Sequence, residues 1–180
     1  MERTFNALFL SQRNAARGRL AAALLNNMGR GRFRAFSAGV QPVASMDPVA
    51  AEVLAHAGIT PGDARPRRPE EFIGEEAPPL DFVFTLSDES AGETPPKWPG
   101  HTVTANWRCE DPAKFPRQDP EHRLSLIRTR SELERRLRAF INLPVASLDR
   151  MSLQKLTAQA PQQPHPGQMP ANHSYPRSSQ

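Results

Sequence analysis

The sequence predicts an α/β fold, an open four-stranded parallel sheet with helices on both faces. Nearly continuous apolar runs at 5–10 and 81–86 are typical of strands that are covered on both sides. Segments with apolar residues at helical spacing lie between the strands. Because strands that alternate with helices pair in parallel through right-handed crossovers, we expect helices on both faces.

The first two strand–helix units have clear boundaries. The strand at 5–10 precedes a helix that starts near Arg17, and Gly29 supplies its C-terminal stop. A second strand is expected at 33–37, ending at Ala38-Gly39. Asp47-Pro48 predicts an N-cap followed by proline at the first helical position, and Gly58 ends that helix. The apolar positions expected on the two helices are Leu20, Leu24 and Met28, then Val49, Val53, Leu54 and Ala57.

The second half of the chain continues the alternation after a long excursion. Residues 60–79 are rich in proline and acids, with one helical turn expected around 69–73. Strands are expected at 81–86 and 102–107, joined by a loop that Trp98 anchors. Asp119-Pro120 opens a long helix that reaches about Asn142, and a short helix follows at 147–156. The long helix is expected to turn Leu124, Ile127, Leu133, Leu137, Phe140 and Ile141 toward the core, and its pairs Glu132–Arg136 and Glu134–Arg138 toward solvent.

The 180 residues suit one domain, at 1–157, followed by a tail at 158–180 that is rich in proline and glutamine and is expected to be disordered. No apolar run approaches the roughly 18 residues that span a bilayer. The N-terminus lacks the pattern of a secretory signal, so we expect a cytoplasmic protein without membrane contacts. The single cysteine, Cys109, cannot form an internal disulfide.

The net charge of +4 is unevenly distributed. Residues 1–50 carry seven arginines and two acids, whereas residues 51–100 carry four basic residues and ten acids, so the N-terminal part favours an anionic ligand. Nucleic acid is not favoured, because no groove-reading motif accompanies the alternating arginines at 30, 32 and 34. The histidines at 56, 101 and 122 are too scattered for a metal site, and no cofactor is predicted.

The polar loop after the first strand, in LFLSQRNAARG at 8–18, has the spacing of an anion-binding turn. A tight turn from strand to helix directs backbone N–H groups inward, and the helix N-terminus adds partial positive charge. Arg17 can close over the remaining oxygens, and Asn14 tolerates left-handed dihedrals. The expected contacts to the anion come from Gln12, Arg13, Asn14, Ala15, Ala16 and Arg17.

Five ordered motifs then give the chain a family resemblance over about residues 5–157. They are SQRNAARG at 11–18, FSAG at 36–39, LDFVFTLSDESAGE at 80–93, WPG at 98–100 and NWRCEDP at 106–112. The chain resembles low-molecular-weight protein tyrosine phosphatases, and more closely their arsenate reductase branch, whose loop has the form Cys-x5-Arg. The resemblance implies the fold of these proteins, with Arg17 in the phosphate-binding loop and Asp111 at the position of the general acid.

The same resemblance exposes departures at the reacting centre. Ser11 stands where the family has its nucleophilic cysteine, and the positions of the two relay cysteines of the reductases correspond to Ser87 and Pro95. Arg13, Ala15 and Gly18 also replace family residues, a glycine, a hydroxyl residue and a serine. The resemblance therefore implies that arsenate reduction by the family mechanism is lost, because no thiol relay exists.

Three functional hypotheses follow. The first is a pseudophosphatase that binds phosphate, sulfate, an arsenate-like oxyanion or a phosphorylated protein without turnover. The second is a weak phosphoester hydrolase in which Ser11 or another group attacks. The third is an interaction protein with a vestigial loop, using the acidic 63–93 region or the tail. Asp111 is either the remaining general acid or an Asp-Pro turn residue, and Cys109 either an exposed thiol beside the pocket or an ordinary cysteine.

Overall fold

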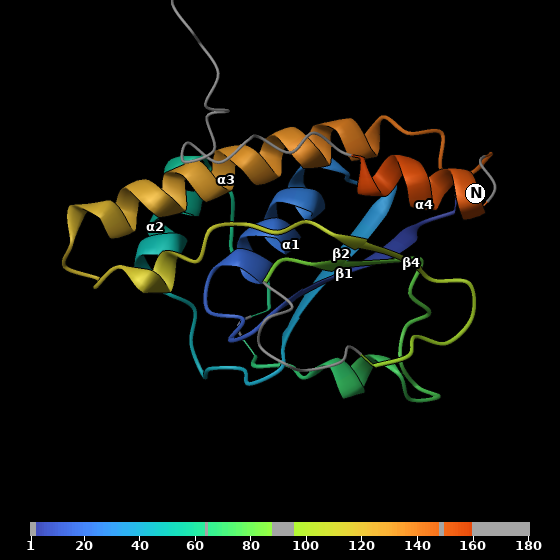
Figure 1. The fold of residues 1–180 in the computed structure, drawn as a ribbon, viewed down its shortest axis with the longest axis horizontal. Helices are drawn as coiled ribbons and strands as arrows, with labels where there is room; N and C mark the ends of the chain where they lie inside the picture. Colours follow the sequence, from blue (N-terminus) through green and yellow to red (C-terminus); the bar gives the residue numbers. More distant parts are fainter. Residues whose placement is uncertain (1–2, 64, 88–95, 148–149, 160–180) are drawn as a thin grey trace, which may run out of the picture.

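A computed structural model describes residues 3–63, 65–87, 96–147 and 150–159 (Figure 1). The strands are β1 (Phe5–Ser11), β2 (Phe33–Gly39), β3 (Phe82–Thr85) and β4 (Val103–Asn106). They form one parallel sheet in the order β2-β1-β3-β4, which confirms the predicted fold class. The helices are α1 (Arg17–Met28), α2 (Pro48–His56), α3 (Pro120–Ile141) and α4 (Arg150–Ala158), with 3-10 turns η1 (Pro69–Phe72) and η3 (Pro112–Lys114).

The helices lie unevenly on the two faces of the sheet. The larger core cluster joins residues of α1, α2, α3 and α4 to one face, whereas Phe72 of η1 and Trp98 pack on the other. Figure 1 shows the long helix α3 on the first side and η1 on the second. The connection from β1 to β2 carries α1 on the first face. The longer connection from β2 to β3 first places α2 on that same face and then crosses the second face, where η1 packs.

Short sequence signals set the element ends as predicted. Gly29 is the C-cap of α1, and the Oδ1 atom of Asp47 accepts from Val49 N at 2.9 Å to cap α2. Asp119 caps α3 in the same way through Glu121 N at 2.9 Å. These caps satisfy backbone donors that have no partner inside the helix.

The core is built on aromatic rings from alternating strand positions. Phe9 and Phe84 stack with 5.0 Å between ring centroids, and Phe84 lies 4.1 Å from Trp107. Phe140 of α3 meets Phe84 edge-on at 5.2 Å. The long helix is thereby held against the two central strands, which fixes the carboxyl edge of the sheet where the loop begins.

Part of the predicted burial of α3 is wrong. Leu124 and Ile127 are 46% and 40% exposed, while Leu133, Leu137 and Phe140 are buried as expected. The buried stripe continues toward the N-terminus of α3 through Leu126 and through three polar residues, His122, Ser125 and Thr129. Arg136, expected on the solvated face, is 2% exposed and forms an ion pair with Glu132. Counting apolar residues misplaced the stripe because several of its positions hold polar side chains. His122, Ser125 and Arg136 each have a hydrogen-bond or ion-pair partner, whereas Thr129 Oγ1 is buried without one.

The C-terminal helix is shifted from its predicted position at 147–156. The described helix α4 runs from Arg150 to Ala158 and packs Leu153 into the main core. It passes the predicted domain end at residue 157, and the expected tail beyond residue 159 lies outside the described residues. Within the described ranges, no helix combines the length and the apolar character needed to cross a membrane.

Candidate oxyanion-binding site

The loop at residues 12–16 leaves the carboxyl end of β1, an interior strand of the sheet, and leads into α1. In open parallel sheets, ligands bind at this edge, next to the strand where the connections change direction. The first turn of α1 has neither a side-chain cap nor an acidic residue. No negative side chain of the first turn therefore neutralises the positive end of the α1 dipole, which faces the loop.

Five consecutive carbonyl groups of the loop are held outward by donors from elsewhere in the fold. Four of the donors are backbone N–H groups of the segment that follows β2: Val40 to Ser11 O (3.3 Å), Gln41 to Gln12 O (2.9 Å), Val43 to Arg13 O (3.0 Å) and Asp47 to Ala15 O (2.8 Å). The fifth is Arg19 Nε, which donates to Asn14 O at 2.8 Å. Because the C=O and the following N–H of a trans peptide point in opposite directions, the N–H groups are directed inward.

Asn14 makes the tight turn possible. Its φ of 48° lies in the left-handed region, as predicted, and among the described residues no other non-glycine has a positive φ. The end of β2 approaches so closely that a Cβ at Gly39 would lie 3.0 Å from two backbone atoms of the loop, Arg13 C and Asn14 N. The Gly39 of the FSAG motif therefore allows two backbone segments to touch.

Ser11 lies at the base of this turn and is 3% exposed. Its hydroxyl oxygen accepts a hydrogen bond from Asn14 N at 3.2 Å, so one of the inward N–H groups reaches the side chain at position 11. Gly18 faces the same atoms: a Cβ there would lie 3.3 Å from Ser11 Oγ and 2.7 Å from Asn14 Oδ1. Asn14 Oδ1 is buried without a hydrogen-bond partner.

An ion pair with Arg17 places Asp111 beside the loop. The Arg17 guanidinium is almost fully buried and donates from Nη1 to Cys109 O (3.2 Å) and Leu86 O (3.4 Å), at the ends of β4 and β3. Its Nη2 lies 3.4 Å from Asp111 Oδ2. Asp111 is half exposed and its Oδ1 accepts from Ala113 N at 3.0 Å, so it also acts as the predicted Asp-Pro turn residue.

The loop, Arg17 and Asp111 enclose a small cavity of about 30 Å³. Arg13 lies at its rim and is exposed. A neighbouring hollow of about 340 Å³ begins at the same rim and is bordered by Phe115, Arg117 and His122. An anion bound at the loop could therefore carry a larger group that extends into this hollow.

His122 is a residue of this region that the sequence reasoning missed. It is 2% exposed, and its Nε2 lies 2.8 Å from Asp47 Oδ2. Its Nδ1 lies 3.0 Å from Pro112 O and 3.1 Å from Phe115 O. The imidazole thus joins α2, α3 and the segment that carries Asp111. No three His, Cys, Asp or Glu side chains of the described residues are grouped so that they could hold a metal ion.

Cys109 is an ordinary buried cysteine rather than an exposed thiol beside the pocket. Its Sγ donates to Trp107 O at 3.2 Å and it belongs to the main core cluster. Burial, with a smaller contribution from the Glu132 carboxylate, raises the pKa of the Cys109 thiol to about 12. A thiol with this pKa is not a nucleophile near neutral pH.

Comparison with known proteins agrees with this geometry. The family model described as low molecular weight phosphotyrosine protein phosphatase matches residues 6–155. No curated protein matches the chain.

Several solved structures share the fold. An arsenate reductase from Archaeoglobus fulgidus is 25% identical with a TM-score of 0.56, covering 73% of this chain and 98% of its own. An arsenate reductase in the phosphate binding state is 21% identical with a TM-score of 0.61, over 77% of this chain and 97% of its own. A thioredoxin-dependent arsenate reductase from Corynebacterium glutamicum is 24% identical with a TM-score of 0.54, over 75% of this chain and 59% of its own.

Proposed function

The chain belongs to the low molecular weight phosphotyrosine protein phosphatase family, and from this premise we propose that it is a pseudophosphatase. The loop at 12–17 binds a phosphate-like oxyanion, or the phosphate of a phosphorylated partner, and does not turn it over. The observation that carries the proposal is the set of outward-held carbonyls from Ser11 to Ala15, which leaves the loop N–H groups to face the small cavity.

Anion binding is supported by the charges at the cavity. The α1 N-terminus has no acidic residue in its first turn, and Arg17 and Arg13 both line the cavity. Among the described residues, Asp111 is the one carboxylate within ion-pair distance of Arg17, and it is half exposed. A phosphate would compete with this carboxylate for the guanidinium and gain the inward N–H groups as well.

Loss of turnover is supported by the surroundings of Ser11. Serine attacks phosphorus only when a base removes its proton. Among the described residues, no histidine or carboxylate is hydrogen-bonded to Ser11, whose Oγ accepts from Asn14 N. Asp111 is paired with Arg17, and both ring nitrogens of His122 face oxygen atoms. We therefore assign Ser11 a place in the anion cradle and no role as a nucleophile.

Thiol-based arsenate reduction is not part of the proposal, although several proteins of similar structure are arsenate reductases. A disulfide within the chain requires two cysteines, and the sequence contains one. That cysteine, Cys109, is buried in the core with a raised pKa. The chain therefore lacks the groups for a thiol relay of its own.

Isothermal titration with phosphate, sulfate and arsenate tests binding. The unmodified chain should bind at least one of the three, and Arg17→Ala should weaken that binding about tenfold or more, since a charge-assisted hydrogen bond to the anion is lost. Arg30→Ala removes the same charge at an exposed position that lines neither the loop cavity nor its neighbouring hollow, and should bind like the unmodified chain. No binding of any of the anions would favour an interaction protein with a vestigial loop.

Turnover of p-nitrophenyl phosphate tests the second half of the proposal. The unmodified chain should not hydrolyse it above background. Ser11→Cys, alone and with Gly18→Ser to place a hydroxyl beside position 11, should gain activity because a thiolate is stabilised by the same N–H groups. Hydrolysis by the unmodified chain that disappears in Ser11→Ala would replace our proposal with a serine-dependent phosphoester hydrolase.

A further inference from the structure

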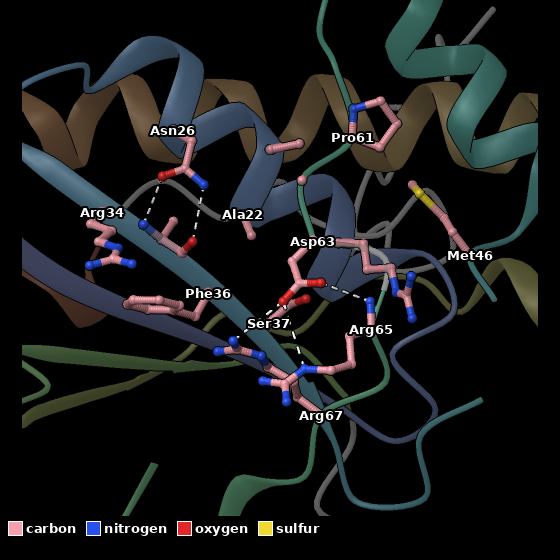
Figure 2. A pocket seen from close by; sticks show the side chains of 14 residues that line it. Ala22, Asn26, Arg34, Phe36, Ser37, Met46, Pro61, Asp63, Arg65 and Arg67 are labelled. Carbon is pink, nitrogen blue, oxygen red and sulfur yellow. Dashed lines mark hydrogen bonds and ion pairs between the residues drawn. The ribbon is translucent and has the colours of Figure 1, made fainter. Parts of the chain in front are cut away.

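A second cavity, of about 300 Å³, lies between α1, β2 and residues 61–63 and 65–67 (Figure 2). It shares no lining residue with the loop cavity or with the hollow beside it. Its volume is within the range of small-molecule sites. One wall is rigid, because the side chain of Asn26 bonds to both the N–H and the C=O of Ala35 and so ties α1 to β2.

The lining of this cavity is strongly basic. Four arginines line it, Arg19, Arg34, Arg65 and Arg67, against the single carboxylate of Asp63, a formal net charge of +3. Concave basic sites of this kind concentrate anions. The four side chains come from α1, β2 and residues 65–67, so only the tertiary structure brings them together.

The Asp63 carboxylate neutralises only part of the positive charge of the four arginines. Its Oδ2 lies 3.3 Å from Arg67 Nη2 and 4.0 Å from Arg65 Nε, and Arg65 also approaches Glu71 at 3.6 Å. Figure 2 shows the Asp63 carboxylate between these two arginines. Arg67 Nε, however, is buried without a hydrogen-bond partner.

Arg34 and Arg67 flank the ring of Phe36. The guanidinium carbons lie 5.1 Å and 5.9 Å from the ring centroid, which orients the two planar groups without using their N–H donors. Among the described residues, no carboxylate is within ion-pair distance of Arg34. Arg34 is therefore available to a ligand through its whole guanidinium, whereas Arg67 shares Nη2 with Asp63 and offers its buried, unpartnered Nε.

The burial of the Arg19 guanidinium also favours binding of an anion in this cavity. It is 6% exposed, and burial lowers its pKa, while the Asp63 carboxylate acts in the opposite direction. A second negative charge in the cavity would further compensate the cost of removing this guanidinium from water.

We propose that this cavity is a binding site for a small organic polyanion, a molecule with at least two carboxylate or phosphate groups. Arg34 and Arg67 bind one anionic group beside Phe36, and the field of Arg19 and Arg65 binds the second. This cavity, of about 300 Å³, has room for a larger ligand than the loop cavity of about 30 Å³, which holds only a single small group.

Citrate is the probe for this site, because it carries three carboxylates and is too large for the loop cavity. Isothermal titration at constant ionic strength should show citrate binding to the full chain and to Arg17→Ala. Arg34→Ala, and Arg34→Ala with Arg67→Gln, should each weaken citrate binding by about tenfold or more per arginine. Arg30→Ala, with the same loss of charge outside the cavity, should bind citrate unchanged.

The Asp63→Asn variant distinguishes two explanations of the arginine cluster: a site that binds an external anion, or arginines whose role is to neutralise the Asp63 carboxylate. The substitution keeps the oxygen that accepts from Arg65 N at 2.9 Å but removes the competing charge, so it should tighten citrate binding. Arg34 is exposed, so the single Arg34→Ala variant keeps the test valid if the double variant does not fold. The proposal fails if the full chain does not bind citrate, or if Arg30→Ala weakens binding as much as Arg34→Ala. Loss of citrate binding in Arg17→Ala would also contradict it and would point to the loop.

Discussion

The guanidinium of Arg19 donates from Nε to the backbone carbonyl of Asn14 at 2.8 Å. A buried side chain of α1 thus holds the residue with the left-handed turn in the loop that precedes that helix. Arg19 also lines the basic cavity. It connects the two proposed sites physically.

Arg19→Met should therefore destabilise the fold and weaken anion binding at the loop together. The substitution keeps the apolar stem and leaves Asn14 O without its donor, which costs about 1–3 kcal/mol in free energy of unfolding. Urea denaturation measures the stability, and titration with phosphate measures the binding. Arg30→Ala is the control, since Arg30 is exposed. Unchanged phosphate affinity in Arg19→Met would show that the loop does not need this hydrogen bond.

Asp111→Asn should strengthen phosphate binding. The carboxylate of Asp111 competes with a bound anion for Arg17, and exposed or half-exposed pairs of this kind contribute about 0.2–1 kcal/mol, so the affinity should rise by a factor of about 1.4 to 5. Asparagine can keep the hydrogen bond from Ala113 N. Asp119→Asn, at the N-cap of α3, is the matched control. A weaker affinity in Asp111→Asn would contradict the competition between this carboxylate and the anion.

His122→Phe should destabilise the protein by about 3 kcal/mol, because it leaves the buried Asp47 carboxylate without its 2.8 Å partner. Asp47→Asn should cost less, since asparagine still caps α2 and can donate to the imidazole. His101→Phe, at an exposed position, should change the free energy of unfolding by less than about 0.5 kcal/mol. Thermal or urea unfolding of the three variants measures this order, and equal losses in all three would contradict it.

Cys109 should make the protein less stable at high pH. Its pKa of about 12 in the folded state lies above the ordinary value of 9.0, so between these values the unfolded chain releases the thiol proton and the folded chain retains it. The contribution to the free energy of unfolding therefore falls by up to about 1.4 kcal/mol per pH unit over this interval. Comparing the pH dependence of unfolding with that of Cys109→Ala isolates the effect. A thiol reagent at pH 8 should label the unfolded chain and not the folded one.

Local patterns were sufficient for most of the architecture. The cap at Asp47, the stop at Gly29 and the left-handed Asn14 depend on neighbouring residues, and the structure has all three where the sequence predicts them. The burial of α3 was harder to predict, because His122 and Arg136 are polar. Their burial depends on the partners Asp47 and Glu132, which the helical pattern of apolar residues does not reveal. The pairing of Glu132 with Arg136 was predicted correctly, but the pair was expected to face solvent and Arg136 is buried.

The sequence by itself determined the order of strands and helices, the position of the loop at the end of β1, and the serine at residue 11. Apolar periodicity and capping residues act over a few positions, so they can be recognised in the chain directly. The tertiary structure decided which groups surround the loop: the donors from residues 40–47, the contact of Asp111 with Arg17, and the four arginines of the basic cavity. These groups are far apart in the chain, and only the parallel sheet brings them to common edges.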